Sequence, residues 1–430
     1  MKINIYLVVV IKVLLFHAYM GLYAEPLKFA ISSESAILIN AETGAVLFEK
    51  EATKLIYPAS TTKIASVLYA LKVKGQQLNE MYVADQECLG TVTHETKRKA
   101  GYKLPAYRLE PDGTSISLKK GEAMSLRDLL AGAMIVSGND AANVFAHGIS
   151  KNIPTFMDQV NLYLKQIGCR NTRFLNPHGL HHPDHQTTAQ DLAIMAREAL
   201  KEPFFREIVM RTRFIRPKTN MQASSTHLAL NLLVRSGKYH YSKAIGIKTG
   251  YHAKAKSVLV AAAESDHRTL IAVMTGNPER KQMFVEVVKL FEMAFNQPKV
   301  RRTYIKAGRQ SFSKDMPQAS HPLQTYLPND LSLEYYPAED PLAKCQLIWR
   351  ELELPIRKNQ VVADLQLIAV SGIVLKQTQL LATDAIGLSW PYNGIRKMAL
   401  FYKNYHDIAW FLTGLFILSL AFTGWVVIRR

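Results

Sequence analysis

The chain has 430 residues, 48% of them hydrophobic and 9% aromatic, so it can form two or three globular domains and is not largely disordered. Its formal net charge is +18 at pH 7, which indicates an anionic partner such as a nucleic acid, an acidic polymer or a phospholipid surface. A merely basic soluble surface is the other explanation. Because the two chain ends indicate export, we expect no nucleic acid and favour an anionic polymer or lipid of the cell envelope.

Both ends carry apolar segments that are typical of an exported membrane protein. Residues 1–24 combine Lys2, an apolar run and a final alanine, which predicts a secretory signal peptide. Since Lys12 interrupts the apolar run, an uncleaved anchor remains an alternative. Residues 408–428 carry no charge and are long enough to cross a bilayer, although a buried core helix is also conceivable. The arginines that follow favour the cytoplasmic side, so we expect a single-pass inner-membrane protein whose body faces outward.

Residues 25–297 predict an α+β domain in which an antiparallel sheet packs against a cluster of helices. Two short β runs flank a turn that contains Gly44, and helical periodicity begins at Ser60. Residues 84–121 form a basic excursion with little periodicity. The expected elements are a hairpin at 35–40 and 45–49, helices from 60, at 126–136, from about 140, at 153–167, 188–200 and 278–295, and strands at 244–248, 258–263 and 269–275.

The pattern changes after residue 297. Residues 298–390 contain short alternating runs at 345–349, 361–369 and 373–381, separated by Pro, Asn and Gly, which predict a separate small all-β domain. Residues 391–407 are aromatic and basic and form a juxtamembrane bridge to the predicted transmembrane helix at 408–428.

Cysteine is sparse in this chain. Cys88, Cys169 and Cys345 are odd in number, scattered, and lack the spacing of metal ligands. We therefore expect no structural disulfide, no bound metal and no cofactor.

Three short strings occur in a fixed order and carry candidate catalytic groups. They are Ser-Thr-Thr-Lys at 60–63, Ser-Gly-Asn at 137–139 and Lys-Thr-Gly at 248–250. Each string alone has little weight, because Ser-x-x-Lys recurs at 117–120 and such strings often lie on solvated helix faces or in turns. Their order, their separation and their placement on a helix, a turn and a strand make the set informative.

The first string can supply an activated serine. A serine hydroxyl is a weak nucleophile until a neighbouring base accepts its proton, and residues three apart on a helix lie on one face. Lys63 can therefore reach Ser60. The amine must be neutral to act as a base, and both burial and the second ammonium of Lys248 would lower its pKa. The helix N-terminus at Ser60 also favours negative charge on the attacking oxygen and offers free N–H groups to an oxyanion.

The other strings can bind and orient an acyl substrate. We expect Ser137 to relay a proton and Asn139 to hold both the lysine and a substrate amide. Lys248 and Thr249, at the end of a strand, would bind a terminal carboxylate. Gly250 would leave room for an extended peptide to pair with the edge of that strand.

At these residues the sequence resembles the D-alanyl-D-alanine carboxypeptidases, the low-molecular-mass penicillin-binding proteins. The resembling segments are 57–63, 137–142, 176–180 and 246–251, and the β domain and membrane-attached C-terminus are also similar to the family. The resemblance implies an acyl-enzyme on Ser60 with Lys63 as its base, and an oxyanion hole from the N–H groups of Ser60 and Tyr251. It further implies peptidoglycan stem peptides as substrates and β-lactam antibiotics as inhibitors.

Two departures and three alternatives accompany the resemblance. Residues 253–256 are bulkier and more basic than the glycine-containing stretch common in the family, and Thr-Gly-Asn at 275–277 replaces its Gly-Gly-Arg. A DD-endopeptidase remains possible on these residues. A serine β-lactamase would need a Glu-x-x-Leu-Asn string, which the sequence lacks. A non-catalytic binding module is disfavoured because the serine, both lysines and Asn139 are intact.

Overall fold

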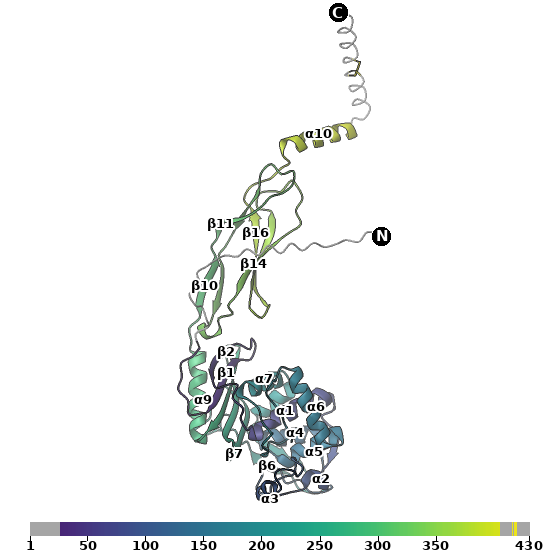
Figure 1. Ribbon diagram of the computed structural model, residues 1–430, viewed down its shortest axis with the longest axis vertical. Coiled ribbons are helices and arrows are strands. Elements are labelled where there is room, and N and C mark those ends of the chain that lie inside the picture. Colours follow the sequence, from purple (N-terminus) through teal and green to yellow (C-terminus); the bar gives the residue numbers. More distant parts are fainter. Residues whose placement is uncertain (1–25, 405–414, 416, 419–430) are drawn as a thin grey trace, which may run out of the picture. The chain divides into compact units, whose positions relative to one another are not determined.

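The computed structural model describes residues 26–404 together with 415, 417 and 418 (Figure 1). These residues form two units, one of 26–298 with 336–340 and the other of 299–335 with the described residues from 341 onward. The predicted signal peptide and nearly all of the predicted transmembrane segment lie outside the described residues. Among the residues that are described, no helix is both long and apolar enough to span a bilayer.

The first unit is built on a five-stranded antiparallel sheet with the order β2-β1-β9-β8-β7. Successive side chains of a strand point to opposite faces of a sheet. In β1, Ile37 and Ile39 join the core beneath the helical cluster, whereas Ala36 and Leu38 join the core beneath α9. Both faces are thus covered, which explains the nearly continuous apolar runs of its strands. The strands are β1 (Ser35–Asn40), β2 (Val46–Lys50), β7 (Ala244–His252), β8 (Lys256–Ser265) and β9 (Arg268–Asn277).

Helices cover the two faces unequally. One face carries the helical cluster and the other carries α9 (Figure 1). Side-chain caps fix several helix starts: Thr188 accepts the N–H of Asp191 at the start of α7, within the helix that the sequence predicted at 188–200. The helices are α1 (Thr62–Lys74), α2 (Gln86–Leu89), α3 (His94–Lys99), α4 (Leu126–Ile135), α5 (Asn139–Ser150), α6 (Ile153–Gln166), α7 (Ala189–Ala199), α8 (Pro203–Met210) and α9 (Arg280–Phe295), with 3-10 turns η1 (Ala59–Thr61) and η2 (Gly75–Gln77).

Most predicted elements of this unit are confirmed, but β7 is longer than expected. The sequence predicted a strand that ends at Lys248, whereas β7 continues to His252, so Lys-Thr-Gly lies inside the strand. The continuation is stabilised by pairing with β8, in which Gly250 faces Val258. The sequence also gave no signal for α8 or for the two-stranded ribbons β3 (Met81–Val83) with β4 (Ala123–Ser125) and β5 (Arg213–Arg216) with β6 (Ser225–Leu228).

A short piece of the later sequence belongs to the first unit. Residues 336–340, which contain the 3-10 turn η3 (Pro337–Glu339), are grouped with it rather than with the segments on either side. Glu339 accepts from Nε of the buried Arg268 at 2.8 Å and from Nδ2 of Asn40 at 2.9 Å. This hydrogen-bonded ion pair joins a buried arginine to a partly buried glutamate, and the two are so far apart in the sequence that no local pattern could predict it.

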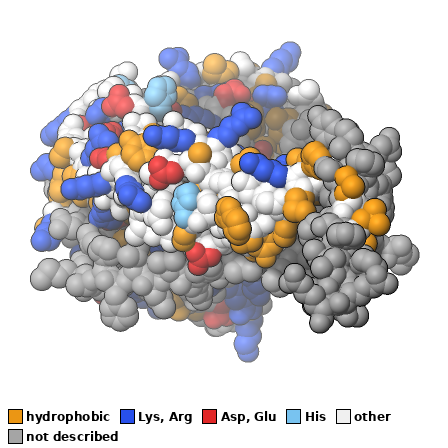
Figure 2. All heavy atoms as spheres, turned by 90° about the horizontal axis from the view of Figure 1, so that it is seen from above, with side chains coloured by type: hydrophobic (Ala, Val, Ile, Leu, Met, Phe, Trp, Pro, Cys, Tyr) orange, Lys and Arg blue, Asp and Glu red, His pale blue; other side chains and the backbone are white. Residues whose placement is uncertain are grey.

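The second unit is rich in β structure. Its core is built mainly from apolar residues of the larger of its two sheets, whose order is β11-β12-β16-β15-β14. On the face seen in Figure 2, Lys and Arg side chains outnumber Asp and Glu, in keeping with the net charge of +18. The elements are β10 (Val300–Ile305) paired with β13 (Leu331–Tyr335), β11 (Gly308–Lys314), β12 (Leu323–Leu327), β14 (Lys344–Trp349), β15 (Val361–Ile368), β16 (Val374–Ala382) and α10 (Trp390–Asn404).

Candidate active site

Ser60 lies in the turn η1 directly before helix α1. The preceding Ala59 has φ +46°, a left-handed conformation that is strained for a residue with a side chain and is enriched at functional sites. Strand β7 lies against this turn, and a side chain at Gly250 would come within 3.0 Å of the backbone nitrogen of Ser60. Glycine at this position therefore allows the edge strand to approach the serine.

Lys63 is fully buried one helical turn after the serine. Its Nζ lies 3.1 Å from Oγ of Ser60, and it donates to Oδ1 of Asn139 at 2.7 Å and to the carbonyl oxygen of His178 at 2.8 Å. The Oγ of Ser137 lies 3.5 Å from the same nitrogen. One amine thus joins the helix, the Ser-Gly-Asn turn and the loop at His178.

Burial disfavours the charged form of both lysines in the site. Desolvation lowers the pKa of Lys63 well below its usual value, and the nearby charge of Lys248 lowers it further, while the carboxylate of Asp140 acts in the opposite direction. Desolvation, with a smaller contribution from the charge of Arg280, lowers the pKa of Lys248 to about 7. Burial thus favours the uncharged form of Lys63, and Lys248 titrates close to neutral pH.

The Ser-Gly-Asn string forms the turn between α4 and α5. Ser137 has φ +66°, and Asn139 is the first residue of α5. The buried carboxylate of Asp140 fastens this turn to the excursion, because it accepts the backbone N–H groups of Ile116 at 3.0 Å and Leu118 at 2.9 Å. Sequence reasoning assigned no role to Asp140, since its partners lie in a stretch without periodicity.

The Lys-Thr-Gly string lies on β7, the edge strand of the sheet. Lys248 and Thr249 are buried, and Nζ of Lys248 donates to the carbonyl oxygen of Thr249 at 2.8 Å. Tyr251, in contrast, is 71% exposed. The structure thus places the predicted carboxylate-binding pair in the interior and leaves the tyrosine side chain at the surface.

Histidines beside the nucleophile turn were not predicted to have a role. The carbonyl of His178 accepts from Lys63, and Nε2 of His185 lies 2.9 Å from Oγ1 of Thr62, which donates to the carbonyl of Ala59 at 2.9 Å. Leu175 N–H donates to Nδ1 of His185, so Nε2 carries the proton and donates to the threonine. The sequence signal near these histidines was the Asn-Pro-His-Gly-Leu segment at 176–180. It indicated a resemblance to the family but predicted none of these contacts.

Comparison with known proteins identifies the family. A family profile described as D-alanyl-D-alanine carboxypeptidase matches residues 22–279. The chain belongs to this family. It is 30% identical to D-alanyl-D-alanine carboxypeptidase DacF of Bacillus subtilis over 296 residues, which cover 66% of this chain and 70% of the relative. It is 27% identical to DacA of Haemophilus influenzae over 352 residues, which cover 79% and 83% of the two chains.

Solved structures share the carboxypeptidase fold. Penicillin-binding protein 5 from Haemophilus influenzae matches with a TM-score of 0.57 at 24% identity, covering 84% of this chain and all of that one. D-alanyl-D-alanine carboxypeptidase DacD from Francisella tularensis matches with a TM-score of 0.59 at 20% identity, covering 85% and 96%. The mixed helix and sheet class expected from the sequence is confirmed, whereas the transmembrane helix stays a prediction.

Proposed function

We propose that this family member removes the terminal D-alanine from peptidoglycan stem pentapeptides through an acyl-enzyme on Ser60. The observation that carries the proposal is the fully buried Nζ of Lys63, 3.1 Å from Oγ of Ser60. An amine that burial keeps neutral and that lies within proton-transfer distance can act as a general base.

Acylation would begin with transfer of the serine proton to Lys63. The Ser60 oxygen then attacks the carbonyl carbon of the penultimate D-alanine, and the resulting oxyanion receives N–H groups from Ser60 and Tyr251. The close approach of Gly250 to the Ser60 nitrogen supports this pairing of a turn with a strand. The C–N bond breaks, the proton passes to the leaving amine directly or through Ser137, and free D-alanine departs.

Substrate orientation would rely on the edge of β7. Protonated Lys248 and the hydroxyl of Thr249 bind the terminal carboxylate, and Asn139 holds the substrate amide while it fixes Lys63. A water molecule then attacks the ester and regenerates the serine. The extended peptide pairs with β7 because this strand has a neighbour in the sheet on one side only.

The alternatives raised by the sequence are less well supported. The family profile and the relatives are described as carboxypeptidases, which does not favour an endopeptidase, a β-lactamase or a non-catalytic module. The contacts of Lys63 and the depressed pKa values also support a working site.

We further propose that the protein works in the cell envelope, anchored in the inner membrane by residues 408–428 with both described units on the outer face. The uncharged span, the terminal arginines and the apolar leader support this arrangement. The excess of basic side chains would favour contact with anionic lipid or wall polymer.

A direct assay tests the proposed reaction. Purified full-length protein is incubated with a pentapeptide that ends in D-Ala-D-Ala, and released D-alanine is measured beside covalent labelling by a fluorescent penicillin. We expect both signals in the wild type and neither in Ser60→Ala. Unchanged pentapeptide with the folded wild-type protein would refute the proposal.

A further inference from the structure

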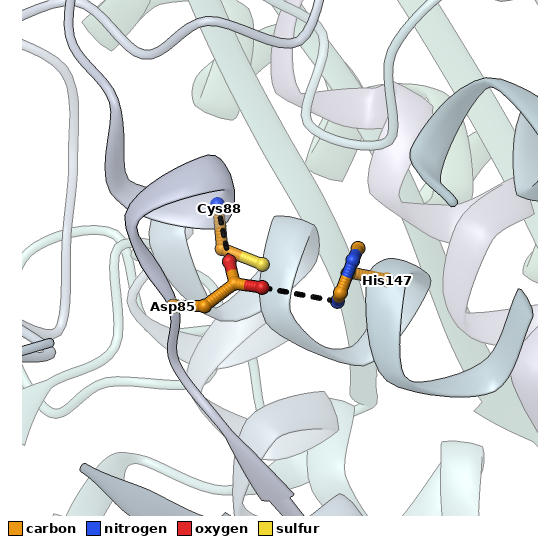
Figure 3. Close-up of side chains that lie close together, drawn as sticks. All are labelled: Asp85, Cys88 and His147. Carbon is orange, nitrogen blue, oxygen red and sulfur yellow. Dashed lines mark hydrogen bonds and ion pairs between the residues drawn. The ribbon is translucent and has the colours of Figure 1, made fainter. Parts of the chain in front are cut away.

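Asp85, Cys88 and His147 bring a carboxylate, a thiol and an imidazole together outside the set of active-site residues. One possible ligand atom of each lies within 4.8 Å of the other two. Asp85 precedes α2, Cys88 lies within it, and His147 belongs to α5. Figure 3 shows the sulfur and the carboxylate directed toward the space beside the imidazole ring. The linear spacing of the cysteines could not indicate this group, because its third member is far along the chain.

The existing contacts of the three side chains leave ligand atoms available. One oxygen of Asp85 caps α2 by accepting the N–H of Cys88 at 2.8 Å, and the other lies 3.5 Å from Nδ1 of His147. The Cys88 thiol contacts the carbonyl oxygen of Asn143 at 3.8 Å, which is a long and weak hydrogen bond. The second carboxylate oxygen, the sulfur and Nδ1 can therefore act together.

We propose that these three side chains bind one zinc ion. Zinc prefers thiolate, imidazole and carboxylate ligands in a four-coordinate arrangement, with bonds of about 2.0–2.3 Å. Binding would draw the ligand atoms together by up to about 1 Å and would release the thiol proton to solvent. The Asp85 and His147 side chains are 43% and 28% exposed, so water can enter as the fourth ligand, while Cys88 is buried.

The ion would fasten the basic excursion to the helix that begins with Asn139. An amide already joins these parts, since Nδ2 of Asn143 donates to the carbonyl oxygens of Cys88 and Tyr107, both at 2.9 Å. Zinc would add a second, stronger connection between α2 and α5. Because an ion that binds the folded state alone stabilises it, zinc should raise the thermal stability of the protein.

Cobalt titration of the chelator-treated full-length protein tests the site, because cobalt reports its ligands in its absorption spectrum. The protein carries Cys345→Ser, since that thiol is exposed. We expect one cobalt per chain with a thiolate-to-cobalt charge-transfer band. Cys88→Ser should abolish the band, and His147→Gln should weaken binding by at least the roughly 10–100-fold that loss of an outer-shell partner costs. The matched control is Cys169→Ser, which alters another buried thiol and should keep the band.

Thermal unfolding with and without zinc gives a second measurement. Zinc should raise the melting temperature of the Cys345→Ser protein and of the Cys169→Ser control, and not that of His147→Gln. Since His147 is partly exposed, its variant is expected to fold even if Cys88→Ser does not. Cobalt binding without a thiolate band, or a band and a zinc shift that survive His147→Gln, would overturn the proposal.

Discussion

The Nζ of Lys63 lies 2.7 Å from Oδ1 of Asn139, although the two residues belong to different helices. This contact orients the amine toward Ser60 and satisfies one of the hydrogens of a fully buried side chain. Asn139 thereby becomes a positioning residue as well as a candidate substrate ligand.

The first prediction concerns the general base. Lys63→Met keeps the volume and the burial of the side chain but removes the proton acceptor, so we expect acylation by fluorescent penicillin to slow by about 10²–10⁴-fold. Lys72→Met, at an exposed position of the same helix, is the control and should acylate at the wild-type rate. An unimpaired Lys63→Met variant would show that another group accepts the proton.

The second prediction concerns the pH dependence of kcat/KM. Lys63 must be neutral, so activity rises as pH increases through its depressed pKa. Lys248 must be protonated to bind a carboxylate, so kcat/KM for a free-acid pentapeptide should fall above its pKa of about 7. The same peptide ending in D-alaninamide should lack this alkaline decline. Lys248→Arg should shift the alkaline decline of kcat/KM above the measured pH range, because arginine stays charged. A decline that persists with the amide would assign it to another group.

The third prediction concerns stability. The folded state lowers the pKa of Lys248 from 10.5 to about 7, so at and below pH 7 folding bears the full cost of a buried ammonium. This cost shrinks as pH rises toward 10.5, where the unfolded chain also loses the proton. Lys248→Met should therefore raise the free energy of unfolding by roughly 1–4 kcal/mol at pH 6.5 and by less at pH 9.5. Denaturant unfolding at both pH values measures the difference; a gain that grows with pH would contradict the argument.

The fourth prediction concerns the approach of β7 to the nucleophile. In Gly250→Ala the new methyl group would lie 3.0 Å from the Ser60 nitrogen and 3.2 Å from the Pro58 carbonyl oxygen, so strand and turn must separate. Relief of these contacts requires a shift of a few tenths of an ångström, whereas a misplacement of about 1 Å can cost about 100-fold in rate; we therefore expect the acylation rate constant to fall, by less than about 100-fold. The control Gly75→Ala meets no atom within 4 Å and should leave the rate unchanged.

The fifth prediction concerns Asp140. Asp140→Asn replaces with an amide the carboxylate that accepts the N–H groups of Ile116 and Leu118, so part of the excursion loses its partner. Hydrogen bonds to charged groups contribute about 1.5–3 kcal/mol, and we expect a loss of this size in denaturant unfolding. Acylation should also slow, because the adjacent Asn139 holds Lys63. Asp266→Asn, in the exposed turn before β9, is the control and should leave stability and acylation unchanged.

Local patterns predicted much of the first unit. The helix that starts after Thr188, the hairpin around Gly44 and the helix at 153–166 follow from caps, turns and apolar periodicity, all of which are encoded within a few residues. The full length of β7 was missed, because its last residues are polar and are held by pairing with β8 rather than by their own pattern. The contacts of Asp140 and His185 were missed for a related reason, since their partners come from distant segments.

The sequence by itself determined which chemical groups are available, their order and the local elements that carry them, because side-chain identity and periodicities of 2 and 3.6 residues are local properties. The tertiary structure decided which of these groups meet. It buries Lys63 against Asn139 and the His178 carbonyl, lowers the pKa of two lysines, and assigns residues 336–340 to the first unit. These outcomes depend on how helices pack on a sheet and exclude water, and that packing is a property of the whole fold.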